Sequence, residues 1–310
     1  PQVATAFNVP FEGSTKVACY FAFRAVLLDS ATISEHVPQN EGSFRPIKVT
    51  APLGSIFNPI YPAAAEARFN QIQRVVDCII KALAPVIPDK ITAGCSADVS
   101  AIAYSGVRQE GNYWVFIEVN EGAYGGRPAS DGPDGIEELM RNTRNNPIED
   151  LGMHLPLICD RYELRDDVMP GAGEYRGGIG MIKVQRYLTD GSLTHESDRH
   201  ADAPWGFLGG TAGVGARVQK FNIATPESIE ELPGKVHGLR NKVGDCIGVL
   251  SACGGGYGDP LARSPEQVRE DVLDDYCTIE HARAAYGVVL NSKLEIDAAA
   301  TQARRSEMRE

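Results

Sequence analysis

The sequence predicts a mixed α+β fold, with a few long helices and a second half rich in β-strands. Apolar residues recur at helical spacing in the first 90 residues and again after residue 264. Between these regions, short apolar or alternating runs are separated by glycine pairs, which is typical of strands joined by turns. The expected strands are Asn112–Val119 and residues 155–159, 161–165, 179–188, 216–222 and 246–251.

Two helices are expected near the start of the chain. Residues 15–29 are apolar almost all round, which predicts a buried helix. A second helix is expected from Pro62 to Leu83, since proline suits a first helical turn and Pro85 ends the pattern. The passage between them is rich in turn-forming residues and holds one short expected strand at Ile47–Thr50.

Later helices are expected at three places. A short helix at Gly135–Arg141 follows a glycine-rich turn, and a long helical pattern runs from Pro265 to Tyr286. The last stretch, Lys293–Glu310, is charged and rich in alanine. We expect it to be a helical or frayed tail used in subunit contacts.

The run Ser251–Leu261 contains four glycines in five positions. Glycine is used where the backbone must turn or approach another group closely. The run lacks the GxxxxGK[S/T] pattern of a P-loop, and Pro260 interrupts the dinucleotide-binding pattern. A tight structural loop is therefore favoured over the wall of a binding site.

Composition limits the class of partner. The 310 residues are 43% hydrophobic and 23% charged, with a formal net charge of −11. This acidity disfavours nucleic acids and anionic membranes, which require clustered basic side chains. The seven cysteines include no CxxC pair, so we expect reduced thiols in the cytoplasm.

The segment His195–His200 concentrates groups that could bind a metal or transfer protons. His195, Asp198 and His200 are the candidate catalytic residues, but their spacing does not match HExxH. A strand end could present such groups to a divalent cation; a solvated turn is the alternative. Trp205, just beyond, could wall a pocket or fill the core.

Two polar segments are further candidates. Asn142–Glu149 places the Arg144 guanidinium, the Asn145 amide and the Glu149 carboxylate in one loop, where they could hold a carbonyl or carboxylate. Asparagine and proline also form turns, so this segment has a structural alternative. Glu118–Arg127 is similar: a strand end opens into a glycine-rich turn with Glu118, Tyr124 and Arg127 as candidate substrate-binding residues.

Eight motifs between Asn40 and Leu290 resemble those of the hydantoinase B/oxoprolinase family, and the resemblance covers the chain from about residue 2 to 290. They are Asn40-x-Gly42-x-x-Arg45-Pro46-Ile47, Ala51-Pro52-x-Gly54-Ser55-x-x-Asn58-Pro59, Asn142-x-x-Asn145-x-Pro147-Ile148-Glu149, Tyr162-Glu163-Leu164-Arg165, Pro170-Gly171-Ala172-Gly173-x-x-Arg176-Gly177-Gly178-Ile179-Gly180, Pro204-Trp205-Gly206, Gly254-Gly255-Gly256-Tyr257-Gly258-Asp259-Pro260 and Ala282-Arg283-x-x-Tyr286-Gly287-Val288-Val289-Leu290. Arg176, in the fifth motif, is a further candidate for substrate binding.

The resemblance implies a share in a multi-chain enzyme. Family members work with an A-type subunit that handles ATP and Mg²⁺, and together they open cyclic amides such as hydantoins, 5-oxoproline or lactams. The alternatives are a subunit of an acetone- or acetophenone-type ketone carboxylase, or a non-catalytic structural half of either complex. In each case the substrate is a small molecule.

The resemblance also implies that residues 1–290 are the C-terminal portion of a B-type subunit, with 291–310 as the charged tail. The family's His/Asp motifs, which resemble a Zn²⁺ or Mn²⁺ site, do not occur in this sequence. A polypeptide carrying the N-terminal half would bind that metal, and no metal ligand is assigned to this chain.

Overall fold

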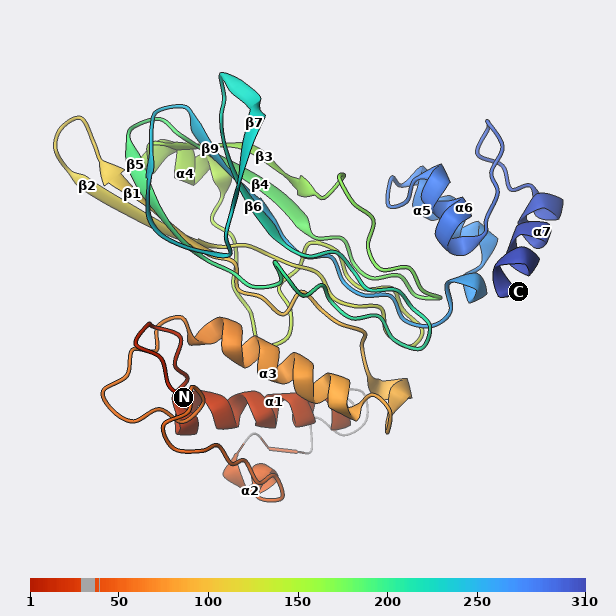
Figure 1. The fold of residues 1–310 in the computed structure, drawn as a ribbon, viewed down its shortest axis with the longest axis horizontal. Coiled ribbons are helices and arrows are strands. Elements are labelled where there is room, and N and C mark those ends of the chain that lie inside the picture. Colours follow the sequence, from red (N-terminus) through yellow and green to blue (C-terminus); the bar gives the residue numbers. More distant parts are fainter. Residues whose placement is uncertain (29–36, 39) are drawn as a thin grey trace. The chain divides into compact units, whose positions relative to one another are not determined.

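The computed structural model describes residues 1–28, 37–38 and 40–310, which form two compact units (Figure 1). One unit comprises Pro1–Ile91, Ala97–Val99 and Leu139–Arg141. The other comprises Thr92–Ser96, Ser100–Glu138 and Asn142–Glu310.

Helices build the first unit. A π-helical turn at Phe11–Thr15 leads into α1 (Lys16–Leu27), which packs against α3 (Arg68–Leu83). A short α2 (Glu41–Phe44) and a 3₁₀ turn at Pro88–Lys90 complete it. The expected helix at 15–29 is confirmed over Lys16–Leu27, whereas Asp29 lies outside the described residues.

A second expected helix is confirmed in part, and one expected strand is wrong. The helix expected from Pro62 begins at Arg68 instead, because Asn8 hydrogen-bonds the Ala64 carbonyl and the Ala67 N–H donates to Ala6. The strand expected at Ile47–Thr50 is irregular, since no described segment pairs with it.

The second unit contains two antiparallel sheets (Figure 1). One has the strand order β2-β1-β5-β8 and the other β3-β4-β9-β6-β7. Their strands are β1 (Ala101–Val107), β2 (Tyr113–Val119), β3 (Leu157–Leu164), β4 (Met181–Tyr187), β5 (Gly191–Glu196), β6 (Arg217–Asn222), β7 (Thr225–Leu232), β8 (Lys235–Asn241) and β9 (Asp245–Leu250).

The largest hydrophobic cluster joins the inner faces of both sheets. Tyr104 of β1, Trp114 of β2 and Tyr187 of β4 lie in it with their ring centroids 6.0–6.4 Å apart where they meet. Leu193 of β5 and Ile247 of β9 belong to the same cluster and are 0% exposed. The second unit therefore contains a β-sandwich with an aromatic core.

The strand predictions are confirmed for β2, β4, β6 and β9. The two strands expected at 155–159 and 161–165 are one strand, β3, with an irregularity in its pairing between Cys159 and Arg161. The helix expected at Gly135–Arg141 is wrong. Gly135 has φ +50° and donates to the Ile179 carbonyl, and Ile136 pairs with Gly122, so these backbone groups bond to neighbouring segments.

Extended segments outside the named strands lie side by side beyond one end of the sandwich (Figure 1); they are residues 92–96, 121–135, 170–180, 203–216 and 251–258. Gly254, Gly255 and Gly256 donate their N–H groups, each at 2.9 Å, to three different segments, at Gly178, Gly94 and Thr211. A Cβ atom at Gly254 would lie only 1.9 Å from the Tyr124 carbonyl oxygen. Residues 254–256 thus have backbone neighbours on three sides. We call this region the glycine bundle. The glycines at 254–256 allow close backbone approach, as expected, but they do so in an extended segment rather than in a tight loop.

Three helices follow the glycine bundle. The pattern at Pro265–Tyr286 forms two helices, α5 (Pro265–Leu273) and α6 (Ile279–Tyr286), rather than one. Asp275 between them has φ +61°, and the Thr278 side chain caps the start of α6. The charged tail forms α7 (Ala298–Arg309).

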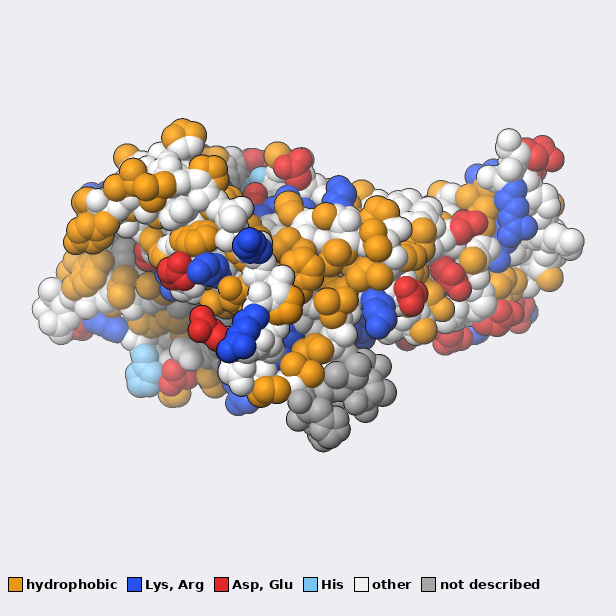
Figure 2. All heavy atoms as spheres, turned by 90° about the horizontal axis from the view of Figure 1, so that it is seen from below, with side chains coloured by type: hydrophobic (Ala, Val, Ile, Leu, Met, Phe, Trp, Pro, Cys, Tyr) orange, Lys and Arg blue, Asp and Glu red, His pale blue; other side chains and the backbone are white. Residues whose placement is uncertain are grey.

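The described helices include none with the length and apolar character needed to cross a membrane. On the face shown in Figure 2, Lys and Arg side chains are scattered rather than gathered into one patch.

Candidate functional site

The interior of the β-sandwich changes from apolar to polar along its strands. On β2, the alternate residues Trp114, Phe116 and Glu118 face the other sheet, and on β4 the corresponding series runs Tyr187, Gln185, Lys183. The polar members lie where β2 ends and β4 begins, next to the glycine bundle. Buried charge at this position requires partners.

A buried ion pair joins the two sheets at this polar end. The Lys183 Nζ contacts Glu118 Oε1, and the two side chains are only 3% and 7% exposed. The Lys183 ammonium also lies 4.4 Å from the ring centroid of Tyr162, its cross-strand neighbour on β3. Burial raises the pKa of Glu118, and the charge of Lys183 opposes that rise.

Tyr162 connects this ion pair to the surface. Its hydroxyl donates to Glu121 Oε1 at 2.7 Å and accepts a hydrogen bond from the exposed Asn145 amide. Burial, together with the hydrogen bond to Glu121, raises the pKa of Tyr162 well above its usual value. The phenol is therefore held protonated, as a hydrogen-bond donor. We call Glu118, Glu121, Asn145, Tyr162 and Lys183 the polar cluster.

His195 lies in the same cross-strand row as Glu118, since both are in register with Ile102 of β1. Glu118 and His195 are therefore two strand spacings apart, or about 10 Å. His195 is 2% exposed, and within the described part of the chain neither of its ring nitrogens has a hydrogen-bond partner. Burial lowers its pKa to about 3, so the ring is neutral.

His200 lies beside His195, with ring centroids 6.2 Å apart, and its Nε2 is 2.6 Å from Ser197 Oγ. Burial lowers the pKa of His200, whereas the nearby Asp198 carboxylate raises it. No group of three His, Cys, Asp or Glu residues within the described ranges could hold a metal ion. His195, Asp198 and His200 therefore do not form a metal centre by themselves.

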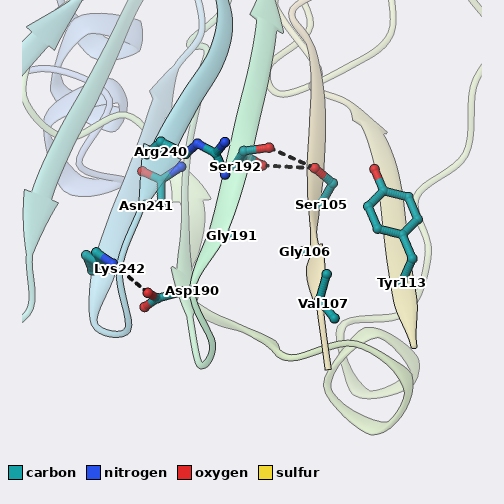
Figure 3. Close-up of a pocket in the computed structure, with 10 residues that line it drawn as sticks. All are labelled: Ser105, Gly106, Val107, Tyr113, Asp190, Gly191, Ser192, Arg240, Asn241 and Lys242. Carbon is teal, nitrogen blue, oxygen red and sulfur yellow. Dashed lines mark hydrogen bonds and ion pairs between the residues drawn. The ribbon is translucent and has the colours of Figure 1, made fainter. Parts of the chain in front are cut away.

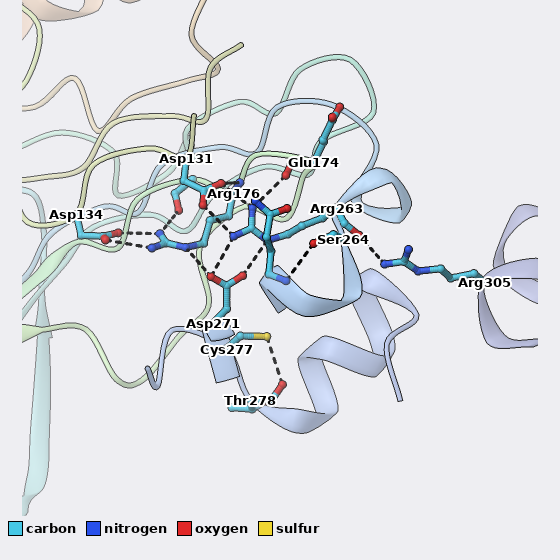
Figure 4. A network of polar contacts seen from close by, with 12 residues as sticks. Asp131, Asp134, Glu174, Arg176, Arg263, Ser264, Asp271, Cys277, Thr278 and Arg305 are labelled. Carbon is cyan, nitrogen blue, oxygen red and sulfur yellow. Dashed lines mark hydrogen bonds and ion pairs between the residues drawn. The ribbon is translucent and has the colours of Figure 1, made fainter. Parts of the chain in front are cut away.

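Arg176 belongs to a separate network of charges (Figure 4). Its guanidinium binds Asp134 through two bonds of 2.8 and 3.2 Å and lies 3.5 Å from Asp271. Arg263 binds Asp271 at 2.8 Å and Asp131 at 2.7 Å. These internal carboxylates compensate the charge of Arg176, and the network ties α5 to the glycine bundle.

The remaining predicted residues lie apart from these contacts. Tyr124 and Trp205 contribute backbone carbonyls to the glycine bundle, and the Trp205 ring packs edge-on against Phe207. Arg127, Arg144 and Glu149 are exposed, Glu149 in the first turn of α4 (Ile148–His154). The structure thus brings Glu118 and Asn145 into one cluster, with His195 in the row of Glu118.

Sequence reasoning missed Lys183, Tyr162 and Glu121 as site residues. The available signal was the pattern Lys183, Gln185, Tyr187 on alternate positions of an expected strand. A charged residue on the face that also carries a core aromatic residue indicates a buried charge with a partner.

Comparison with known proteins agrees with the motifs. The family model for hydantoinase B/oxoprolinase matches residues 1–260. The chain belongs to this family. A "Putative D-/L-hydantoinase" subunit of the B type, from Pseudomonas sp. (strain NS671), is 45% identical over 299 residues, which cover 96% of this chain and 50% of that protein. The chain thus spans about half the length of this family relative.

Two solved structures share the fold of this family member. The nucleotide-free structure of acetone carboxylase matches 98% of the chain and 45% of its own, with a TM-score of 0.79 and 18% identity. The ATP-dependent caprolactamase from Pseudomonas jessenii matches 99% of the chain and 53% of its own, with a TM-score of 0.77 and 23% identity. At these identities the likeness concerns the fold alone.

Proposed function

We propose that the chain is part of an ATP-dependent enzyme that opens a small cyclic amide, such as a hydantoin, 5-oxoproline or a lactam. The observation that carries this proposal is the 45% identity to the B-type hydantoinase relative over 96% of the chain.

The complete enzyme needs further polypeptides in this proposal. An A-type subunit would bind ATP and Mg²⁺, and a polypeptide carrying the N-terminal half of the B-type subunit would bind a Zn²⁺ or Mn²⁺ ion. The described residues do not fit either group: they contain no three-residue metal cluster, and the glycines of 254–256 face neighbouring backbone. We therefore derive no step through ATP or a metal.

The polar cluster would provide hydrogen bonds to the substrate. A cyclic amide offers a carbonyl acceptor and an N–H donor. The exposed Asn145 amide carries a matching donor and acceptor, and the Tyr162 hydroxyl lies directly behind it. The Lys183–Glu118 pair would hold the Tyr162 ring in place from the sandwich interior. Arg144 and Glu149, near Asn145 on the exposed segment, would contact the substrate or its activated form.

His195, Asp198 and His200 are proposed as a second set of catalytic groups. Because His195 and His200 have lowered pKa values, they are neutral near pH 7 and would act as hydrogen-bonding groups rather than as bases. The proposed substrate-binding residues are Glu118, Tyr124, Arg127, Arg176 and Trp205. Of these, Glu118 and Arg176 would act indirectly, by positioning Lys183 and Asp134.

The test is a reconstituted complex of the chain with its A-type and N-terminal-half partners. We expect ATP hydrolysis to increase with hydantoin, 5-oxoproline or a lactam, accompanied by the ring-opened product. No stimulation by any of the three would refute the proposal. Incorporation of labelled bicarbonate into acetone or an aryl ketone would instead assign a carboxylase.

A matched pair of variants tests the polar cluster within that complex. Tyr162→Phe removes the hydroxyl that joins Asn145 to Glu121, and we expect kcat to fall by about tenfold or more with the complex intact. Tyr61→Phe is the control, because Tyr61 is 93% exposed in the other compact unit. Equal activity of the two variants would favour a purely structural role for the cluster.

A further inference from the structure

A hollow lies on the outer face of the four-stranded sheet (Figure 3). It has a volume of about 630 Å³ and lies near the ends of β1, β5 and β8 that are opposite to the polar cluster. Ser105, Ser192 and Arg240 occupy one cross-strand row on these three strands. The hollow is therefore separate from the candidate site in the sandwich interior.

Two small hydroxyl side chains form the centre of the hollow. Ser105 Oγ and Ser192 Oγ are 3.0 Å apart, and either can donate to the other. Ser105 Oγ also lies 3.5 Å from the Ser192 carbonyl oxygen, to which it can donate. When Ser105 is the donor, Ser192 keeps its hydroxyl proton for another acceptor. Figure 3 shows the longer side chains of Arg240 and Tyr113 on opposite sides of this serine pair.

The hollow carries one positive charge that is not compensated. Lys242 and Asp190, at one end, neutralise each other through an ion pair of 2.6 Å. The Arg240 guanidinium, by contrast, forms no ion pair or side-chain hydrogen bond with the residues that the structure describes. In a chain with a net charge of −11, this cation next to two hydroxyl groups favours an anionic ligand.

We propose that this hollow binds a small oxyanion, either a carboxylate or a phosphoryl group. The planar Arg240 guanidinium would hold two of its oxygens, as arginine does with carboxylates and phosphates. With Ser105 as the donor within the serine pair, the Ser192 hydroxyl would donate to an oxygen of the same group, and the Tyr113 ring would cover an apolar body attached to it. The inference does not depend on the cyclic-amide proposal, because none of these residues belongs to the polar cluster.

Isothermal titration calorimetry of the chain tests the site, with inorganic phosphate and acetate titrated separately at constant ionic strength. We expect saturable binding of at least one probe with one site per chain, and the probe that binds more tightly identifies the group. Arg240→Gln should weaken this binding by about tenfold or more. Arg45→Gln is the matched control, since it removes the same charge from an exposed position in the other unit.

A double variant, Ser105→Ala with Ser192→Ala, keeps the test informative if Arg240→Gln does not fold. It should weaken binding by about fivefold to tenfold, the loss of one hydrogen bond. The proposal is overturned if neither probe binds saturably. It is also overturned if the Arg240 and Arg45 variants lose equal affinity, or if the double serine variant binds as tightly as the wild type.

Discussion

The Lys183–Glu118 pair shows at the scale of single residues why buried charge indicates function here. A buried ion pair is often no more stabilising than apolar side chains of the same volume, because both charges lose their hydration. This pair instead lies between two sheets with the Tyr162 ring against its cation. The pair holds the Tyr162 ring in place, and the Tyr162 hydroxyl contacts the exposed Asn145. Apolar residues in the same positions would offer no cation to the ring.

Lys183→Met should destabilise the protein by about 3–5 kcal/mol, because it leaves the Glu118 carboxylate buried without its partner. Urea unfolding measures the loss, and adding Glu118→Gln to the variant should restore part of it. Lys16→Met is the control, since Lys16 pairs with the exposed Glu12 on a helix surface. A similar midpoint for the Lys183 and Lys16 variants would contradict this account of the pair.

The buried His195 makes the free energy of unfolding depend on pH. Its folded pKa of about 3 lies below the ordinary value of 6.5, so the folded state favours the neutral ring. The corresponding stability is complete above pH 6.5 and is lost as the pH falls from 6.5 towards 3, by up to about 1.4 kcal/mol per pH unit.

His195→Leu should flatten that dependence, because leucine has no proton to gain. Urea unfolding at several pH values between 4 and 7 measures the slope for each variant. His237→Gln, at an exposed position on β8, is the matched control and should keep the wild-type slope. An unchanged slope in the His195 variant would assign the acid sensitivity to other groups.

At the scale of elements, strands with alternating or continuous apolar residues were predictable, as β2 and β9 show. β7 was not, because Thr225–Glu231 is exposed throughout and has no apolar alternation. β1 was missed because its small residues, Ala101-Ile-Ala-Tyr-Ser-Gly, give a weak strand pattern. The helix expected at 135–141 failed because its backbone hydrogen bonds go to distant segments, which no local pattern records.

The candidate site was predictable only in part for the same reason. Glu118 and Asn145 stood out as polar residues in segments typical of function, but no local pattern indicates their connection through Tyr162. Lys183 meets Tyr162 through the pairing of β3 with β4, and meets Glu118 through the packing of two sheets. Both contacts depend on tertiary structure rather than on local spacing.

Because the glycine bundle is closely packed, we expect a single added methyl group to destabilise it. Gly254→Ala would place its Cβ 1.9 Å from the Tyr124 carbonyl oxygen, a backbone atom that cannot rotate away. We expect the variant to misfold or to lose several kcal/mol of stability, about what overpacking costs at its upper end. Thermal unfolding and solubility measure the effect.

Gly152→Ala is the matched control for this methyl group. Gly152 lies in α4, where an added Cβ meets no atom within 4 Å, so alanine should stabilise the helix by up to about 1 kcal/mol. If Gly254→Ala unfolds at the same temperature as Gly152→Ala, the glycines of the bundle are not required by close packing.

At the scale of the second unit, Arg263 connects parts of the chain that are distant in sequence (Figure 4). Its side chain, 2% exposed, pairs with Asp131 and with Asp271 of α5 and donates to the Glu174 carbonyl. Its own carbonyl accepts a hydrogen bond of 2.7 Å from Arg305 of α7. The Arg263 guanidinium thus links α5 to the glycine bundle beside the Arg176–Asp271 contact, and the Arg263 carbonyl binds α7. The carboxylates raise the pKa of Arg263 despite its burial.

Arg263→Met should release these helices. It leaves Asp131 without this cation and Asp271 with Arg176 alone, an arrangement expected to cost about 3–5 kcal/mol. Because the loss is local to the attachment of α5, limited proteolysis should cut the variant between the glycine bundle and α5 before the sandwich is digested. Arg283→Met, at an exposed position on α6, should keep the wild-type cleavage pattern. Protection of the same bonds in both variants would show that apolar packing of α5 and α6, rather than the charge network, holds the C-terminal helices in place.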